Sequence, residues 1–266
     1  MINKDKLAAS LDKVRQNSPL VHCITNYVAM NFNANALLAI GASPVMAHAK
    51  EEMADMTAIA SSLVLNIGTL DEQWVEGIFA AGNSMKSLGR PIVFDPVGSG
   101  ATPYRTQVCK RIIEECQPTI IRGNGSEIMS LVDADVLSKG VDSSVASTVA
   151  LEAAKALAKS SGAVVVISGE IDYITDGDQV ETIANGSKMM TSVTAMGCTA
   201  TVVVGAFAAV CDTPFEAALY AMALMGVVGE ASAEAAAGPA SLQLHFLDTL
   251  YNITGEELAQ CVKQCR

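Results

Sequence analysis

The sequence predicts an α/β fold with a central, mostly parallel sheet and helices on both faces. Short apolar runs alternate with longer alanine-rich segments of helical period, which is typical of successive βα units. The runs are short and mostly apolar, as expected of strands buried on both faces. No Pro/Ser-rich linker or block of charge divides the 266 residues, so we expect a single domain over residues 1–266.

Eight strands are predicted along the chain. Asp176-Gly177-Asp178-Gln179 resembles a hairpin turn, and it lies between the last two predicted strands, one around Tyr173 and one over Val180–Ile183. The first six, in chain order, are Leu20–Ile24, Pro44–Ala47, Leu63–Ile67, Ile92–Phe94, Thr119–Ile121 and Val164–Ile167.

Five helices are predicted between these strands, and stop signals at Gly41 and Gly89-Arg90-Pro91 end two of them. Residues 1–18 are polar and of mixed charge and predict a further helix, and the chain after Cys198 is expected to be almost wholly helical. The longest hydrophobic stretch, residues 215–237, is rich in Ala and Gly and contains three glutamates, which favours a buried helix over a membrane span. The five helices are Val28–Ile40, Lys50–Ala60, Glu72–Leu88, Tyr104–Cys116 and Ser144–Ser160.

Composition limits the classes of partner. Apolar residues make up 50% of the chain and charged residues 17%, and this apolar surplus favours a homo-oligomer. A formal charge of -11 and a pI near 4.7 oppose nucleic acid and anionic lipid, so a small ligand is expected. A nucleotide would need local help from a magnesium ion, an arginine and backbone amides.

Seven cysteines are an odd number, and no CxxC pair with zinc spacing is present. Reduced thiols are therefore expected. The first 18 residues contain no apolar segment typical of a secretion signal, so the cytoplasm is the expected location.

Polar residues follow the predicted strands. Because ligands bind at the carboxyl ends of the strands in open α/β sheets, these positions are the expected site. The polar segments are Thr25-Asn26, Gly68-Thr69, Asp95-Pro96-Val97-Gly98-Ser99-Gly100, Arg122-Gly123-Asn124 and Ser168-Gly169-Glu170.

Asp95 and Glu127 are the candidate magnesium ligands, since carboxylates with retained waters suit this hard cation. Asn124 would orient a water of the ion. The competing interpretation is that these acidic residues beside glycines are helix caps or turn formers. Arg122 is expected to bind phosphate oxygens with its forked guanidinium, and the alternative is that it forms a surface ion pair. Ser168 is expected near the nucleotide, and the alternative is that Ser168-Gly169 is only a turn.

The segment Thr194–Ala200 precedes a run of small residues that predicts a tightly packed helix. The first free amides of such a helix form an anion site, and an amide cradle of this kind stabilises a phosphoryl group in flight. Cys198 would lie at the entrance of this helix, where the dipole favours thiolate over thiol. From its residue type alone, inert packing is the more frequent role of such a cysteine.

The usual motifs of several common enzyme classes are absent from this sequence. The sequence contains no GxxxxGK[ST] loop, no GxGxxG after a strand and no GxSxG elbow. Its three histidines are interpreted as structural, so Cys198 has no histidine placed to activate it as a hydrolase nucleophile.

At this level of detail the chain resembles the hydroxyethylthiazole kinase family, whose members take part in thiamine salvage and have a ribokinase-like three-layer sandwich. The resemblance covers nearly the whole chain. The matching stretches are Val21-His22-Cys23-Ile24-Thr25-Asn26-Tyr27-Val28, Gly41-Ala42-Ser43-Pro44-Val45-Met46, Asp95-Pro96-Val97-Gly98, Arg122-Gly123-Asn124 with Glu127, and Gly197-Cys198.

The resemblance implies that ATP and Mg²⁺ support phosphorylation of the primary alcohol of 4-methyl-5-(2-hydroxyethyl)thiazole. It implies a homotrimer with the acceptor site between subunits. It also implies three sets of site residues: Met46, Asn26, Gly68 and Ala195 at the thiazole, Arg122 and Ser168 at ATP, and Gly197 and Cys198 at the reaction centre, with Cys198 in the position of the catalytic base.

Two departures from the family pattern are present. Ala195 occupies a position where the family commonly has glycine, and Gly238-Pro239-Ala240-Ser241 replaces a Gly-Pro-Gly-Ser pattern. Two rival functions remain beside the thiazole kinase. One is another enzyme of the same fold, such as a hydroxymethylpyrimidine kinase or a nucleotide-dependent hydrate dehydratase, and the other is a sensor that binds thiazole or nucleotide without turnover.

Overall fold

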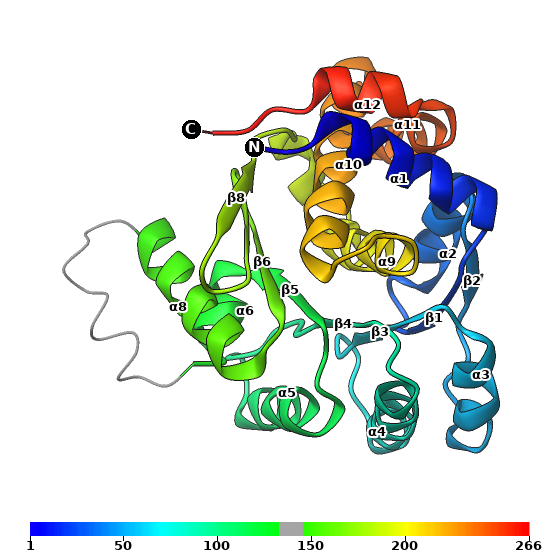
Figure 1. Cartoon of the computed structure of the whole chain (residues 1–266), viewed down its shortest axis with the longest axis vertical. Coiled ribbons are helices and arrows are strands. Elements are labelled where there is room, and N and C mark those ends of the chain that lie inside the picture. The colour runs from blue at the N-terminus through cyan, green and yellow to red at the C-terminus, as the bar shows by residue number, and fades with distance from the viewer. Residues whose placement is uncertain (133–145, 266) are drawn as a thin grey trace.

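A single sheet forms the centre of the molecule, and helices cover both of its faces (Figure 1). The computed structural model describes residues 1–132 and 146–265. In this part of the chain the strand order is β2-β1-β3-β4-β5-β6-β7-β8. The strands are β1 Leu20–Ile24, β2 Ser43–Val45, β3 Ser62–Asn66, β4 Ile92–Asp95, β5 Ile120–Asn124, β6 Val164–Ser168, β7 Asp172–Thr175 and β8 Val180–Ile183.

The helices alternate with the first six strands and then follow one another at the C-terminal end of the chain. In chain order they are α1 Lys4–Asn17, α2 Met30–Ala39, the 3-10 helix η1 Lys50–Glu52, α3 Met53–Ile59, α4 Glu72–Ser87, α5 Pro103–Cys116, α6 Gly125–Met129, α8 Ala146–Ser161, the 3-10 helix η2 Lys188–Ser192, α9 Met196–Ala208, α10 Pro214–Ala235, α11 Pro239–Asn252 and α12 Gly255–Cys261.

The predicted α/β class is confirmed. Strands β1 to β6 pair in parallel, and β7 and β8 form the predicted antiparallel hairpin at the edge of the sheet. One boundary changes the interpretation of a site residue. Strand β5 continues to Asn124 because its parallel ladder with β6 extends through the pair Asn124–Ser168, so Arg122 lies within a strand and does not follow one.

Most predicted helices occur close to their expected positions. The helix predicted from Val28 begins at Met30, because the chain first turns at Asn26, whose carbonyl accepts the N–H groups of Ala29 and Met30. The segment predicted as Lys50–Ala60 is a 3-10 turn followed by α3. The first two residues of the helix predicted from Ser144 lie outside the described residues, and α8 begins at Ala146.

Strand side chains alternate between two cores, one on each face of the sheet. Val64 and Val93 belong to the core shared with α1, α2, α9, α10 and α11, whereas Leu65 and Phe94 belong to the core shared with α3, α4, α5 and α8. This alternation follows from the two-residue period of a strand. It explains why most residues of these runs are apolar on both faces of the strand.

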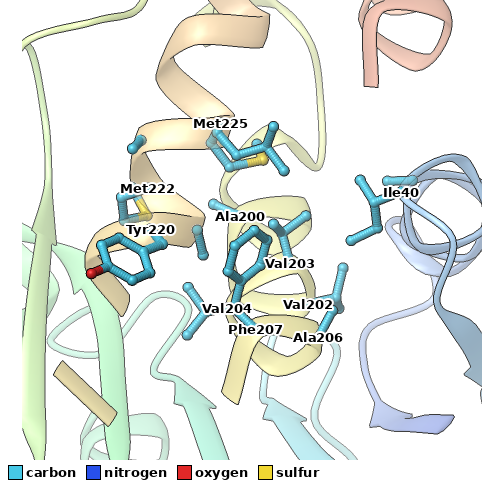
Figure 2. Packing of buried hydrophobic residues seen from close by; sticks show 14 of the residues in the cluster. Ile40, Ala200, Val202, Val203, Val204, Ala206, Phe207, Tyr220, Met222 and Met225 are labelled. Carbon is cyan, nitrogen blue, oxygen red and sulfur yellow. The ribbon is translucent and has the colours of Figure 1, made fainter. Parts of the chain in front are cut away.

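Helices α9 and α10 form a closely packed pair on one face of the sheet (Figure 2). Gly205 of α9 lies against the sheet, where an added Cβ would be 2.6 Å from the Val64 side chain. Only glycine allows α9 to approach β3 this closely. Helix α10 is long and apolar enough to cross a membrane by length and composition, but 78% of its most apolar window is buried, so the prediction of a buried helix is confirmed.

The strand order reverses at β1, which lies between β2 and β3. In open α/β sheets this switch point creates a crevice at the carboxyl ends of the strands, and ligands bind there. The ligand site is therefore expected at the residues that follow β1 and β3 and at the start of α9.

Candidate active site

Side chains from the carboxyl ends of the central strands converge on the first turns of α9. Asn26, after β1, donates from Nδ2 to Cys198 Sγ at 3.3 Å. Thr201 of α9 donates to Asp95 Oδ2, at the end of β4, at 2.7 Å. Arg122 of β5 donates to Ser168 Oγ of β6. We call Asn26, Met46 and Gly68 the β1–β3 side of the site, and Asp95, Arg122 and Ser168 the β4–β6 side.

Helix α9 begins with an uncapped turn. No side chain caps it, and its first backbone hydrogen bond runs from Thr199 N–H to the Ala195 carbonyl at 2.8 Å. Within the described residues, the amides of residues 196–198 therefore have no partner. Free N–H groups at the positive end of a helix dipole favour an anion. This is the amide cradle that the sequence predicted.

Ala195, immediately before α9, has left-handed backbone dihedrals, with φ of +68°. Its Cβ makes this conformation costly, by about 1–2 kcal/mol. The departure from glycine at this position is thus a source of local strain at the entrance of the cradle.

Gly197 leaves room for the Arg122 guanidinium. An added Cβ at Gly197 would lie 2.8 Å from Arg122 Nη1. The glycine therefore brings the arginine and the free amides of α9 together, which concentrates positive potential at one point. This physical reason for glycine before Cys198 is visible only in three dimensions.

Cys198 is partly buried and faces the amide of Asn26. Burial raises the pKa of its thiol, the Asp95 carboxylate raises it further, and the side chains of Asn66 and Asn26 oppose the shift. Burial and the Asp95 carboxylate thus act against the thiolate that the position at a helix start was expected to favour. The free protein holds Cys198 as a neutral thiol at neutral pH.

Asp95 is the most buried charged group of the site, with 1% of its surface exposed. Its Oδ2 accepts hydrogen bonds from Asn66 and Thr201 and lies 3.9 Å from Arg122 Nη1, whereas its Oδ1 has no partner within the described residues. Burial raises the pKa of Asp95 to about 6, and Arg122 is the largest influence in the opposite direction. A buried acceptor without a donor fits a cation or a water bound to one.

Arg122 is 8% exposed, and its Nε also has no hydrogen-bond partner among the described residues. The expected alternative of a surface ion pair is wrong, because Arg122 is buried beside Asp95. Ser168 is held by the turn that follows it, in which Gly169 N–H donates to Asp172 Oδ1 at 3.0 Å. Burial raises the pKa of Asp172 to about 6.

Glu127 forms a capping box at the start of α6. Its Oε2 accepts from Asn124 N–H at 2.8 Å, and Asn124 Oδ1 accepts from Glu127 N–H at 2.9 Å. Its Oε1 accepts from Gly98 N–H at 2.9 Å. The structural interpretation of Glu127 as a cap is therefore confirmed, and each carboxylate oxygen keeps further lone pairs. Its role as a metal ligand stays a prediction.

Asn26 and Gly68 pack against each other on the β1–β3 side. An added Cβ at Gly68 would lie 2.7 Å from Asn26 Nδ2, so only glycine fits there. The Asn26 side chain is already engaged, because it bonds Asn66, Cys198 and the Ala29 N–H. Its direct effect is to orient Cys198.

Met46 lies in the segment after β2 and is partly buried against the core. His22 contacts this segment, because its Nε2–H donates to the Ala47 carbonyl at 2.8 Å. Burial lowers the pKa of the His22 ring, which favours its neutral form. The structural interpretation of His22 is confirmed. The place of Met46 at the acceptor stays a prediction.

Three residues of the site were missed by sequence reasoning. Asn66 accepts from Asn26 and from Gly68 N–H, both at 2.9 Å, and donates to Asp95 at 3.1 Å. Arg105 of α5 donates to the carbonyls of Ile67, Val97 and Gly68. Thr201 was hidden in the small-residue run. An asparagine inside an apolar strand was the one available signal, because a buried amide requires partners.

The donor set fits magnesium, although no compact metal cluster is present. Among the described residues, no group of three or more His, Cys, Asp and Glu side chains is arranged to hold a metal ion. Magnesium commonly uses one or two protein carboxylates and completes its shell with water and substrate phosphates. Asp95, with its unpartnered Oδ1, meets this requirement.

Two cavities lie away from these residues. An open groove of about 490 Å³ runs along α5 and is lined by residues that include Thr102, Lys110 and Glu114. A small hollow of about 40 Å³ lies between α1 and the start of α10. Gly100, at the end of one predicted polar segment, lines the groove, but none of the residues assigned to thiazole, ATP, metal or the reaction centre lines either cavity. We therefore assign the site from the convergence of side chains at α9.

Comparison with solved structures first defines the class. A ribokinase-like superfamily protein from Enterococcus faecalis V583 has a TM-score of 0.65 and 13% identity, over 94% of each chain. A pyridoxal kinase from Staphylococcus aureus, solved with AMP-PCP and pyridoxal, has a TM-score of 0.61 and 16% identity, over 80% of this chain and 88% of that chain. These likenesses concern the fold alone, and they show that the chain has the same α/β fold as these two proteins.

Closer similarities define the family. The profile of the hydroxyethylthiazole kinase family matches residues 11–256. Hydroxyethylthiazole kinases from Nitratidesulfovibrio vulgaris and Vibrio parahaemolyticus are 48% and 51% identical, covering 99% and 97% of this chain and 98% and 97% of theirs. The solved hydroxyethylthiazole kinase of Pyrococcus horikoshii OT3 has a TM-score of 0.89 at 37% identity, over 98% of this chain and all of that chain. The chain belongs to the hydroxyethylthiazole kinase family.

Proposed function

We propose that the protein transfers the terminal phosphoryl group of ATP to the primary alcohol of 4-methyl-5-(2-hydroxyethyl)thiazole, as part of thiamine salvage. Family membership supports the reaction. One observation supports the site: the free amides of α9, the buried Arg122 guanidinium and the Cys198 thiol meet at the start of a single helix. The alcohol oxygen forms a bond to the γ-phosphorus, and the bond to the β–γ bridging oxygen breaks to release ADP.

The chain's own contribution is mainly electrostatic. Phosphoryl transfer passes through a loose transition state with charge on the equatorial oxygens, so fixed donors are more effective than a strong base. The amides of residues 196–198 donate to these oxygens, and Arg122 binds the phosphates with its forked guanidinium. Ser168 holds Arg122 in position.

Cys198 orients the acceptor hydroxyl. Its raised pKa keeps the sulfur neutral in the free protein, and the Asn26 amide fixes its position. In a loose transition state the hydroxyl loses its proton late, to an oxygen of the transferred phosphoryl group, so the neutral sulfur has only to accept a hydrogen bond from the hydroxyl. The thiazole ring lies on the β1–β3 side, over Met46 and beside Gly68 and Ala195.

Asp95, assisted by Glu127 through a water, is proposed to hold magnesium. The ion would neutralise phosphate charge when bound. The unpartnered Asp95 Oδ1 supports this assignment. Cation binding would also stabilise the ionised form of a carboxyl group whose pKa burial has raised to about 6.

A homotrimer with sites between subunits, in the cytoplasm, completes the proposal. Tyr27 and Val28, which follow Asn26, are 59% and 63% exposed, and apolar side chains beside a site suit an interface. Introducing a charge with Val28→Glu should dissociate the oligomer and raise the acceptor KM. An unchanged sedimentation coefficient in this variant would contradict an interface at Val28.

The central experiment is incubation of the purified protein with ATP, magnesium and the thiazole alcohol, followed by mass detection of thiazole monophosphate. A parallel panel with hydroxymethylpyrimidine and with hydrated NADH tests the rival enzymes of the same fold. Binding of the thiazole without ADP formation at saturating magnesium would favour the sensor instead. A covalent mass adduct on Cys198 would favour the nucleophile hypothesis.

A further inference from the structure

Three aromatic rings from three different segments, two loops and the start of a helix, meet next to the β1–β3 side of the site. Tyr27 follows β1, His48 follows β2 and Trp74 lies in the first turn of α4, after β3. The ring centroids of Tyr27 and Trp74 are 4.9 Å apart, and those of His48 and Trp74 are 4.3 Å apart. We call these three residues the Trp74 cluster. Trp74 is the single tryptophan of the chain.

Each outer ring is directly connected to a residue assigned to the acceptor. Tyr27 is the neighbour of Asn26, and its N–H donates to Thr69 Oγ1, next to Gly68, at 3.2 Å. His48 Nδ1 donates to the Met46 carbonyl at 3.2 Å. The two loops are therefore attached to one central ring.

Trp74 is fixed at its backbone but not at its polar atom. Its N–H donates to the N-cap Asp71 at 2.8 Å, and α4 approaches the β2 loop so closely that a Cβ on Gly77 would lie 2.6 Å from the His48 carbonyl. The indole is 2% exposed, and its Nε1 has no hydrogen-bond partner within the described residues. The indole is therefore held without a hydrogen bond, by packing in the core on the α4 side of the sheet and by its ring contacts with Tyr27 and His48.

We propose that the Trp74 cluster is a positioning element for the acceptor: Tyr27, His48 and Trp74 set the spacing of the loops that carry Asn26, Met46 and Gly68. The proposal rests on the proposed function, in which these loops bind a planar heteroaromatic alcohol. It assigns the cluster to acceptor affinity and not to ATP, because among the described residues no hydrogen bond, ion pair or cation–π contact joins a ring of the cluster to Asp95, Arg122 or Ser168.

Steady-state kinetics test the cluster without removing the buried indole. Tyr27→Ala and His48→Ala should each raise the acceptor KM about threefold to tenfold, the range that corresponds to one aromatic pair, and leave the ATP KM within about twofold. Tyr27→Phe and His48→Phe keep a ring and should restore the acceptor KM. Tyr251→Ala, at an exposed tyrosine of α11, is the control. Equal changes in both KM values, or no rescue by phenylalanine, would overturn the proposal. If Tyr27→Ala alters the sedimentation coefficient, its KM change also reflects a change of oligomeric state, and the KM values of His48→Ala then test the proposal.

Tryptophan fluorescence separates this inference from the proposed function. Titration of the wild-type protein with the thiazole alcohol should change the Trp74 emission with a midpoint near the acceptor KM, whereas ATP without magnesium should not. Turnover without any emission change would overturn the positioning role and leave the proposed function standing. An emission change without thiazole phosphate formation would support the positioning role and refute the proposed reaction.

Discussion

The two sides of the site differ in how completely their polar groups are satisfied. On the β1–β3 side, Asn66 Oδ1 accepts from Asn26 Nδ2 and from Gly68 N–H, and no polar atom of these three residues is both buried and unpartnered in the described part of the chain. On the β4–β6 side, Asp95 Oδ1 and Arg122 Nε are buried without partners. Unsatisfied buried groups cost free energy and are kept where a ligand completes them. The comparison indicates that Asn26, Asn66 and Gly68 already satisfy their polar groups among themselves and their neighbours, whereas Asp95 and Arg122 each retain a buried polar atom without a partner.

The largest expected effect comes from removing the unpartnered carboxylate. Asp95→Asn keeps the size of the side chain and its contact with Thr201 but removes the charge, so kcat should fall about 100-fold or more, as when a preorganised electrostatic group is lost. Steady-state rates across a magnesium titration measure this. Asn66→Ala removes one hydrogen-bond donor to Asp95 but keeps the carboxylate, so it should cost less in kcat. Full turnover by both Asp95→Asn and Glu127→Gln at low magnesium would refute the metal assignment.

The next effect concerns Arg122. Arg122→Ala should raise the ATP KM by about tenfold or more, because a charge-assisted contact to phosphate is lost, and Arg122→Lys should recover only part because it lacks the fork. Gly197→Ala should resemble Arg122→Ala, since its Cβ would lie 2.8 Å from Arg122 Nη1. Initial rates with varied ATP and fixed acceptor provide the values. A larger shift in the acceptor KM than in the ATP KM would indicate that Arg122 contributes to acceptor binding and not to ATP binding.

Stability of the metal-free protein should depend on pH through Asp95 and Asp172, whose pKa values burial raises to about 6 from 3.8. Between these values the folded state binds more protons than the unfolded state, so the stabilisation is complete below about pH 4 and is lost as pH rises through 6. The Asp172→Asn variant lacks this titration. The free energy of unfolding of the variant minus that of the wild type should therefore be larger at pH 8 than at pH 5.

Urea unfolding at the two pH values measures this difference between variant and wild type. The comparison with wild type cancels the carboxylates elsewhere in the chain, such as Glu230 and Asp176, whose lowered pKa values act in the opposite direction. A variant that loses stability relative to wild type as pH rises would have the wrong sign for a raised pKa.

A smaller gain is expected from relieving strain at the entrance of α9. Ala195→Gly should stabilise the fold by about 1 kcal/mol, which corresponds to roughly 2–4 °C in Tm for a domain of this size class. Gln117→Gly is a matched control, because Gln117 also has positive φ, at 51°, but ends α5 away from the site. If Ala195→Gly changes kcat and Gln117→Gly does not, the strain at position 195 affects the amide cradle and not only stability.

The smallest effect is expected at Cys198. Cys198→Asp should keep activity within about tenfold of wild type or raise it, because the loose transition state requires little of the base and Asn26 can donate to a carboxylate as it does to sulfur. Near-complete loss of turnover in a variant with the wild-type melting temperature would count against its role at the acceptor hydroxyl.

Sequence patterns predicted much of this site but not its internal contacts. Asp95, Arg122 and Ser168 were predicted because parallel strands place their carboxyl ends at one edge, and this follows from chain order. Asn66, Thr201 and Arg105 were missed because their partners lie 29, 106 and 38 residues away along the chain. The thiolate prediction for Cys198 rested on the helix start, which is local information, whereas burial of the sulfur, which raises the pKa of the thiol, depends on packing of distant segments.

The sequence by itself determined the α/β class, the parallel order of βα units, the buried nature of α10 and the family. These depend on hydrophobic period and on local motifs, which the chain carries in its order of residues. Tertiary structure alone decided which groups remain unsatisfied, why Gly197 and Gly68 must be glycines, and that Tyr27, His48 and Trp74 meet. Such properties depend on distances between segments remote in sequence, and only the close packing of the folded chain fixes those distances.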